Sequence, residues 1–310
     1  SIGIALGMSG VSTAEEMLRE SDVAMYAAKR QPTGGVRVYE PDMREESRRR
    51  LQLKTELEHA LVAEEFTVHY QPTVTLAGRT VTGFEALVRW QHPDRGLVPP
   101  NDIIPLAEET GLIVPLGRWV LRQACAQAAA WNRMFPHGEP RTMSVNLSIV
   151  QLQRADLVDQ VAGALADSGL EPTQLMLEIT ETVLLDDQPS TRERLLAIKA
   201  LGVRLAIDDF GTGYASLSQL RELPVDVLKI DKSFVDHVAT LVSDAAMTKA
   251  IIEMGEALSL QLIAEGIENE AQSVALQQLR CRHGQGFMFA RPLTVSDAET
   301  LLARPLAAAT

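Results

Sequence analysis

The stretch Arg204-Leu205-Ala206-Ile207-Asp208-Asp209-Phe210 reads as a mostly apolar strand that ends beside two adjacent carboxylates. Seven other segments have a strand-like composition, rich in β-branched and aromatic residues. They are residues 66–74, 80–90, 142–147, 175–182, 227–234, 262–267 and 286–290. Helical stretches separate most of them, and this alternation indicates a mostly parallel α/β sheet. Eight such strands predict a TIM-like (β/α)8 barrel.

The connection between the first two strands departs from this pattern. Only residues 75–79 join them, whereas a parallel crossover takes about a dozen residues or more. We therefore expect this pair to be antiparallel, and the barrel to be a variant with an antiparallel first strand.

The chain before the barrel reads as a short α/β fragment followed by a connector helix. Residues 1–6 form a candidate strand, Ser12 or Thr13 can cap a helix that continues through Ala27, and residues 36–39 form a second short strand. A charged stretch with helical spacing follows. We place the fragment at residues 1–41, the connector at 42–50, the barrel domain at 51–305 and a tail at 306–310.

The composition limits the possible partners and compartments. Of the 310 residues, 41 are acidic and 29 are basic, which gives a net charge of −12. This balance argues against a surface for nucleic-acid polymers or anionic membranes, because both need clustered positive charge. Cys125 and Cys281 lie far apart, so neither a disulfide framework nor a zinc site is expected. No apolar run reaches the length of about 20 residues that spans a bilayer. We expect a cytoplasmic segment without membrane contact, and an anchor in a missing upstream part stays open.

Charged side chains recur in or at the ends of strands that should be apolar. In the second strand, Glu85 and Arg89 share one face by the two-residue period. The later strands carry Glu178, Asp208, Asp209, Lys229, Asp231 and Glu265. An unpaired carboxylate in a dry interior costs several kcal/mol, so repeated acids need a compensating cation. Any single acid could instead form a structural ion pair, but barrels of this kind place their active sites at the strand C-termini. With Asn146 the ligand set is all oxygen, which favours Mg²⁺ or Mn²⁺.

Seven motifs in this order resemble one known family, the EAL-domain cyclic di-GMP phosphodiesterases. They are Glu85-Ala86-Leu87, Asn146-Leu147-Ser148, Glu178-Ile179-Thr180-Glu181, Asp208-Asp209-Phe210-Gly211-Thr212-Gly213, Lys229-Ile230-Asp231, Glu265-Gly266-Ile267-Glu268 and Gln285-Gly286-Phe287. The resemblance implies hydrolysis of cyclic di-GMP to the linear dinucleotide pGpG with two divalent ions, Mg²⁺ or Mn²⁺. Ca²⁺ is expected to be inhibitory, because its larger and looser shell positions water badly.

The resemblance also implies roles for individual residues. Glu85, Asn146, Glu178 and Asp208 would bind the first ion, while Asp208, Asp209 and Glu265 would serve the second. Lys229 would orient the attacking water and Glu265 would accept its proton. The nucleotide site would include Gln71, Arg89 and Gln285. The loop and the ligands would be held in place by Glu181, Asp231 and Glu268.

The N-terminal fragment resembles the C-terminal part of a GGDEF domain, the diguanylate cyclase fold. The matching residues are Ser1-Ile2-Gly3-Ile4-Ala5 and Ala24-Met25-Tyr26-Ala27-Ala28-Lys29, and the turn that names that family is absent. The fragment is therefore not expected to synthesise cyclic di-GMP. The resemblance implies a homodimer and an upstream GGDEF or sensor portion. Ala215 departs from the EAL pattern, which usually has a serine in this loop.

Two other functions compete with the phosphodiesterase. One is a cyclic di-GMP receptor that binds without cleavage and signals through the connector helix; the intact set of acids favours the enzyme. The other is a barrel that uses Mg²⁺ for enolate chemistry, which leaves the motifs of Asn146 and Gln285 unexplained.

Overall fold

The computed structural model describes the chain except residues 8–12, 30–34, 137–139, 186–188, 212–216 and 304–310. The chain divides into two compact units, Ser1–Glu64 and Glu65–Thr310. The helix α2 (Pro41–Ala60) belongs to the first unit. It runs without a break through residues 42 and 51, the predicted starts of the connector and of the barrel domain. The predicted tail, residues 306–310, and Ala215 lie outside the described residues.

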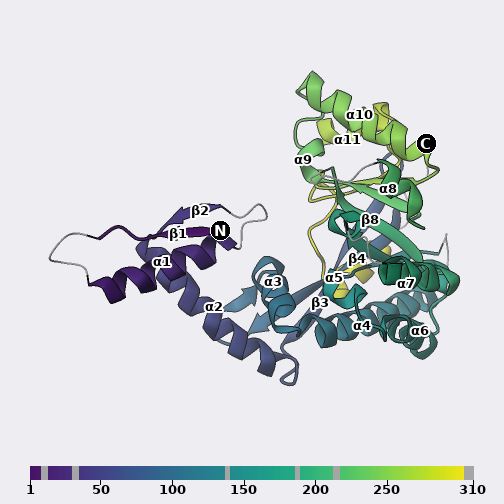
Figure 1. Cartoon of the computed structure of the whole chain (residues 1–310). Coiled ribbons are helices and arrows are strands. Elements are labelled where there is room, and N and C mark those ends of the chain that lie inside the picture. Colours follow the sequence, from purple (N-terminus) through teal and green to yellow (C-terminus); the bar gives the residue numbers. More distant parts are fainter. Residues whose placement is uncertain (8–12, 30–34, 137–139, 186–188, 212–216, 304–310) are drawn as a thin grey trace. The chain divides into compact units, whose positions relative to one another are not determined.

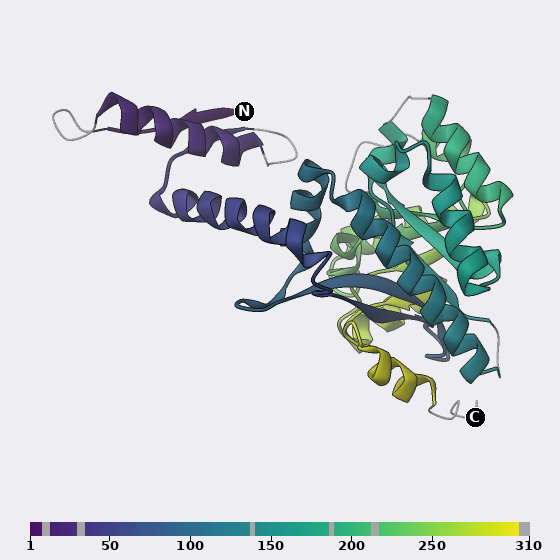
Figure 2. The ribbon, with the colours of Figure 1, turned by 90° about the horizontal axis from the view of Figure 1, so that it is seen from below.

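The first unit contains a parallel βαβ arrangement followed by α2. Strands β1 (Ile2–Ile4) and β2 (Val36–Val38) pair in parallel, and helix α1 (Ala14–Lys29) connects them and lies along the small sheet (Figures 1 and 2). Thr13 caps α1 as expected, because its hydroxyl accepts from the backbone N–H of Glu16 at 3.2 Å. A Cβ at Gly3 would lie 2.0 Å from the carbonyl oxygen of Ser21, so only glycine lets β1 approach α1 this closely.

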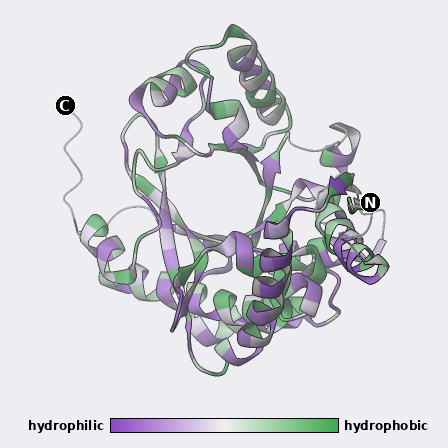
Figure 3. Ribbon diagram, turned by 90° about the vertical axis from the view of Figure 1, so that its left-hand side faces the viewer, coloured by the Kyte–Doolittle hydropathy of each residue, from purple (hydrophilic) through white to green (hydrophobic). Residues whose placement is uncertain are grey.

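The second unit is a closed barrel of eight strands, which Figure 3 shows as a ring. In the order of their pairing these are β3 (Phe66–Thr75), β4 (Val81–His92), β6 (Thr142–Asn146), β7 (Leu175–Thr180), β8 (Arg204–Phe210), β9 (Val227–Ile230), β10 (Gln261–Ala264) and β11 (His283–Gln285). Strand β3 is antiparallel to both of its neighbours, and the other barrel pairs are parallel. The predicted barrel with an antiparallel first strand is confirmed.

Helices and one short strand complete this unit. The described helices are α3 (Pro100–Thr110), α4 (Ile113–Met134), α5 (Ile149–Leu152), α6 (Leu157–Ser168), α7 (Pro189–Ala200), α8 (Leu217–Glu222), α9 (Lys232–Val235), α10 (Val242–Ala257), α11 (Glu270–Gln278) and α12 (Val295–Leu302), with 3-10 turns η1 (Pro172–Gln174) and η2 (Glu181–Leu185). Strand β5 (Gly96–Val98), which the sequence did not predict, pairs with the end of β4. None of the described helices combines the length and apolar character needed to cross a bilayer.

The last strand was predicted in the wrong place. Residues 286–290 form a turn, in which the N–H groups of Phe289 and Ala290 both donate to the carbonyl oxygen of Gly286, and β11 lies just before it. The search for strand-forming residues missed β11 because its sequence, His283-Gly284-Gln285, contains no Val, Ile, Thr, Phe, Tyr or Trp. The predicted strand at 227–234 is also shorter, because Asp231 caps α9.

Four neighbouring strands carry an apolar layer inside the barrel. It consists of Met176, Ala206, Val227 and Ile263, all of them buried. Because side chains alternate along a strand, the residue two positions further on has the same orientation, closer to the carboxyl end. Those four positions are Glu178, Asp208, Lys229 and Glu265. The fold thus places a charged layer directly above an apolar one.

Candidate metal centre

Lys229 lies at the centre of the charged layer. Its side chain is 1% exposed, and Nζ lies 2.6 Å from Glu178, 2.6 Å from Glu265, 3.1 Å from Asp208 and 3.8 Å from Glu85. Burial acts to lower the pKa of Lys229, but the charges of Asp208, Glu178 and Glu265 outweigh it and raise this pKa well above its usual value. One ammonium therefore faces four carboxyl groups, more than a single positive charge can compensate when they are ionised.

Glu178 gives the clearest indication that the site suits a cation. Its side chain is 1% exposed, and Oε2 accepts a hydrogen bond from Lys229 Nζ at 2.6 Å. The other oxygen, Oε1, is buried and finds no hydrogen-bond partner among the described residues. Burial raises the pKa of Glu178 to about 8, against the opposing effect of Lys229. A buried acceptor without a donor costs about 1–3 kcal/mol, more when it is charged, and a metal ion would satisfy it.

Glu85 is held by two amides from other strands of the barrel, Asn146 of β6 and Gln285 of β11. Asn146 Nδ2 donates to Glu85 Oε1 at 2.6 Å, and Gln285 Nε2 donates to Glu85 Oε2 at 2.6 Å. Gln285 also donates to Gln71 Oε1 at 3.1 Å. Since the nitrogen of Asn146 is engaged with Glu85, the oxygen of the same amide points to the other side. These bonds fix the orientation of both predicted ligands.

Asp208, Asp209 and Glu265 form a second group of acids. One oxygen from each lies within 4.8 Å of the others, a spacing that can hold a metal ion. Asp209 is a non-glycine residue in the left-handed conformation, with φ of 54°, a strained backbone of the kind that gathers at functional sites. Burial, followed by the charges of Asp208 and Asp231, raises the pKa of Asp209 to about 6. Burial also raises the pKa of Glu265 well above its usual range.

These residues fit hard divalent cations. The donors are carboxylate oxygens and one amide oxygen, which suit Mg²⁺ and Mn²⁺, and the orphaned oxygen of Glu178 lies among them. The structure brings all six predicted ligands and Lys229 together. All of them except Glu85 lie at or near the carboxyl end of their strand or directly after it. Glu85 lies in the middle of the long strand β4, where it is paired with Ser144 of β6.

The remaining predicted residues bond to backbone or side-chain groups outside the acid cluster. Glu181 Oε2 accepts from the backbone N–H of Gly211 at 2.8 Å and so holds the start of the loop after Asp209. Asp231 accepts from the backbone N–H of Ser233 at 3.0 Å and caps α9, and Glu268 pairs with Lys232. Arg89 is half-buried and donates to the carbonyl oxygen of Val88 at 2.8 Å.

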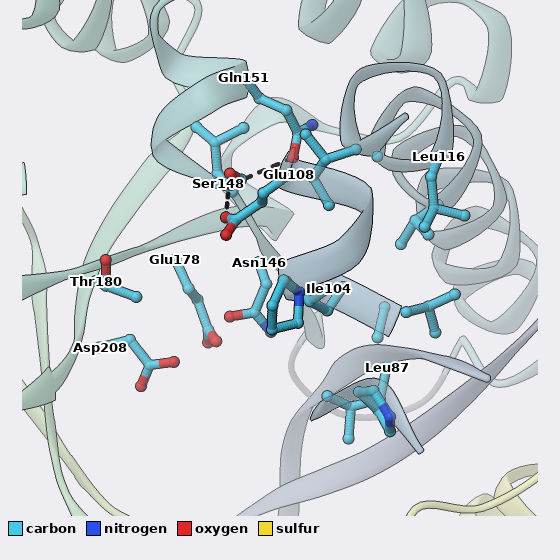
Figure 4. Close-up of a pocket in the computed structure, with 18 of the residues that line it drawn as sticks. Leu87, Ile104, Glu108, Leu116, Asn146, Ser148, Gln151, Glu178, Thr180 and Asp208 are labelled. Atoms are coloured by element: carbon cyan, nitrogen blue, oxygen red, sulfur yellow. Dashed lines mark hydrogen bonds between the residues drawn. The ribbon is translucent and has the colours of Figure 1, made fainter. Parts of the chain in front are cut away.

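A cavity of about 450 Å³ adjoins the acids (Figure 4). Asn146, Glu178 and Asp208 lie on one side of it, and Leu87, Ile104 and Leu116 lie on the other. Ser148 Oγ donates to Glu108 Oε1 at 2.5 Å, which ties α3 to the segment that follows Asn146. Sequence reasoning missed Glu108 and Lys232 because both lie on helices, where a charged residue is ordinary.

Residues 54–292 match the EAL domain family. The chain belongs to this family. The chain is similar to the "Bifunctional diguanylate cyclase/cyclic di-GMP phosphodiesterase MucR" of Pseudomonas aeruginosa, with 43% identity over 303 residues, 98% of this chain and 44% of MucR. The "Signaling protein YkoW" of Bacillus subtilis is 39% identical over 302 residues, 97% of this chain and 37% of YkoW. The chain thus spans less than half the length of these relatives.

Solved structures of EAL proteins have the same fold. The "PaMucR Phosphodiesterase, c-di-GMP complex" superimposes with a TM-score of 0.75 at 42% identity, covering 80% of this chain and 99% of that one. The EAL enzyme Bd1971, in its cAMP and cyclic-di-GMP bound form, gives a TM-score of 0.79 at 30% identity, covering 95% of this chain and 77% of that one.

The raised pKa values predict how the stability of the metal-free EAL domain depends on pH. The pKa of Glu178 is raised from its usual value of 4.5 to about 8 in the folded domain. Its contribution to the free energy of unfolding is therefore complete below about pH 4 and is lost as the pH rises toward 8. In EDTA, we expect the melting temperature of the wild type to fall, relative to Glu178→Gln, between pH 5 and pH 8.5. Thermal melts of both proteins check this, and a constant or growing advantage of the wild type would contradict it.

Proposed function

We propose that this EAL domain hydrolyses cyclic di-GMP to linear pGpG with two divalent ions. The observation that carries the proposal is the buried acid cluster around Lys229 with the unpaired Oε1 of Glu178, a site that is electrostatically incomplete without cations. The similarity to MucR, and to the PaMucR phosphodiesterase solved with c-di-GMP, supports this substrate.

Some of these residues would hold the ions, and others would orient the attacking water and accept its proton. Glu85, Asn146, Glu178 and Asp208 would hold one ion, and Asp208, Asp209 and Glu265 the other. When bound, the ions supply positive charge that stabilises the phosphoryl oxygens and lowers the pKa of water. Lys229 keeps an ammonium beside the reacting phosphodiester and orients the attacking water. Glu265, whose pKa burial raises, accepts the proton of that water. Attack of the water oxygen forms a new bond to phosphorus and breaks one P–O3′ bond. The linear product then carries a 5′-phosphate, and the released 3′-oxygen takes up a proton to become a hydroxyl.

Gln71, Gln285 and Arg89 would bind the nucleotide. Gln71 and Gln285 are buried, are hydrogen-bonded to each other and line a cavity together with Glu85 and Glu265. Their fixed amides can position the substrate against the acids. Arg89 lies on the same strand as Glu85, and we assign it to a phosphate oxygen.

The wider assignments belong to the same proposal. We assign residues 1–41 to the end of a GGDEF domain; the parallel β1–α1–β2 unit supports this, as does MucR, whose alignment covers 98% of this chain and whose name includes a diguanylate cyclase. The family resemblance supports a homodimer, a cytoplasmic location and an upstream GGDEF or sensor portion.

The proposed function is tested by incubating the purified chain with cyclic di-GMP and Mg²⁺ or Mn²⁺ and separating the nucleotides by chromatography. We expect conversion to pGpG, and no conversion in EDTA. Tight binding without turnover would overturn the enzyme and favour the receptor that signals through the connector helix.

Calcium is expected to support binding but to slow cleavage strongly. Ca²⁺ takes 6–8 oxygen ligands in a looser shell, whereas Mg²⁺ requires near-octahedral geometry. The experiment compares the Kd and the initial rate for cyclic di-GMP in Ca²⁺ and in Mg²⁺. Comparable cleavage rates in Ca²⁺ and in Mg²⁺ would contradict the proposal that the acids and Asn146 hold ions with the strict geometry of Mg²⁺.

A further inference from the structure

The charge balance around the proposed substrate site is unfavourable for an anion. Cyclic di-GMP carries two phosphodiester charges, while the site is formed largely by carboxylates. Lys229 is buried and already faces four of these. Among the described residues that line the two cavities next to the acids, Lys232 is the one lysine or arginine. Its side chain is 47% exposed and can therefore reach a bound ligand.

The position of Lys232 is fixed by its surroundings. It follows Asp231 at the start of α9 and lines the cavity that also contains Gln71, Glu265 and Gln285. Its side chain lies on Gly266, where a Cβ would be only 2.4 Å from Lys232 Cγ. Nζ pairs with Glu268 and lies 3.8 Å from Asp236. The ammonium is thus held by Glu268 and Asp236 at the wall of the cavity that Glu265 also lines, and not in the buried acid cluster.

We propose that Lys232 binds the phosphate of cyclic di-GMP that is not cleaved, an inference that rests on the proposed function. The cleaved phosphate has Lys229 and the ligands of the ions around it. Arg89, which we assign to a phosphate oxygen, is not among the residues that line the two cavities, so Lys232 is the cavity-lining cation that remains for the second phosphate. An exposed ion pair such as Lys232–Glu268 contributes little to stability, so a phosphate can replace Glu268 at small cost. A lysine ammonium on a flexible chain is suited to this exchange.

The test measures the Kd of cyclic di-GMP by calorimetry in Ca²⁺, together with kcat and KM in Mg²⁺. We expect Lys232→Met to raise Kd and KM about three- to tenfold and to change kcat less than twofold. Its affinity should also depend less on salt, because a charge contact has been removed. Lys232→Arg should remain within about twofold of the wild type. Lys249→Met, which removes an exposed lysine paired with Glu253 on α10, is the matched control.

If the wild type binds and cleaves cyclic di-GMP but Lys232→Met has an unchanged Kd, this inference is overturned and the proposed function stands. A fall in kcat at constant Kd would place the lysine at the cleaved phosphate and would also overturn it. If the wild type binds without turnover, the Kd comparison still decides the role of Lys232 while the proposed function fails. Absence of binding by the wild type overturns both.

Discussion

Glu85→Ala is expected to abolish turnover of cyclic di-GMP. The substitution removes one proposed metal ligand and also the acceptor of the hydrogen bonds from Asn146 and Gln285. Loss of an outer-shell partner of a metal site costs about 10- to 100-fold in affinity or activity. Loss of a direct ligand that also orients two other residues should reduce activity further. We therefore expect a rate below about 1% of the wild type, measured as initial velocity at saturating Mg²⁺.

Two further variants separate this effect from a general loss of structure. Glu85→Gln keeps the size of the side chain but removes the charge, and it should be nearly as inactive. Glu253→Ala changes an exposed acid on α10 that pairs with Lys249, and it should retain full activity. Near-normal rates in both Glu85 variants, with intact thermal melts, would refute the metal assignment.

Lys229→Met should reduce kcat by about 10²–10⁴-fold, the usual contribution of a positioned proton-transfer or electrostatic group. Methionine has a similar length but no charge, so Glu178, Glu265 and Asp208 lose the ammonium that lies 2.6–3.1 Å from them. The metal-free variant should also melt at a lower temperature than the wild type, because removal of one partner leaves buried charges uncompensated.

The melting temperature and kcat of Lys229→Met should respond differently to divalent ions. Saturating Mn²⁺ should restore much of the lost melting temperature, since positive charge returns to the cluster, but it should not restore kcat. Lys249→Met should match the wild type in both measurements. A normal kcat in Lys229→Met would show that Lys229 has no role in the proposed mechanism.

The barrel and its acidic end could be predicted because both depend on local rules. The short link at residues 75–79 excludes a parallel crossover, and the structure accordingly shows an antiparallel pair. Glu178, Asp208 and Glu265 interrupt apolar strands, and parallel strands bring their carboxyl ends to one edge. The two-residue period then places each acid above a buried apolar residue.

Other features depend on contacts that sequence spacing does not encode. That Lys229 reaches four acids follows from the relative register of five strands. The strand His283–Gln285 is recognisable only from its partners, Ile263 on one side and Thr75 on the other. The bond from Ser148 to Glu108 joins elements 40 residues apart, and the role inferred for Lys232 depends on its packing against Gly266.

The most direct test of the central claim is anomalous diffraction at the manganese edge from crystals of this chain grown with Mn²⁺. The proposed centre predicts two peaks at the carboxyl end of the barrel, one bounded by Glu85, Asn146, Glu178 and Asp208 and the other by Asp208, Asp209 and Glu265. No peak among these residues at saturating Mn²⁺, or peaks only elsewhere on the molecule, would contradict it.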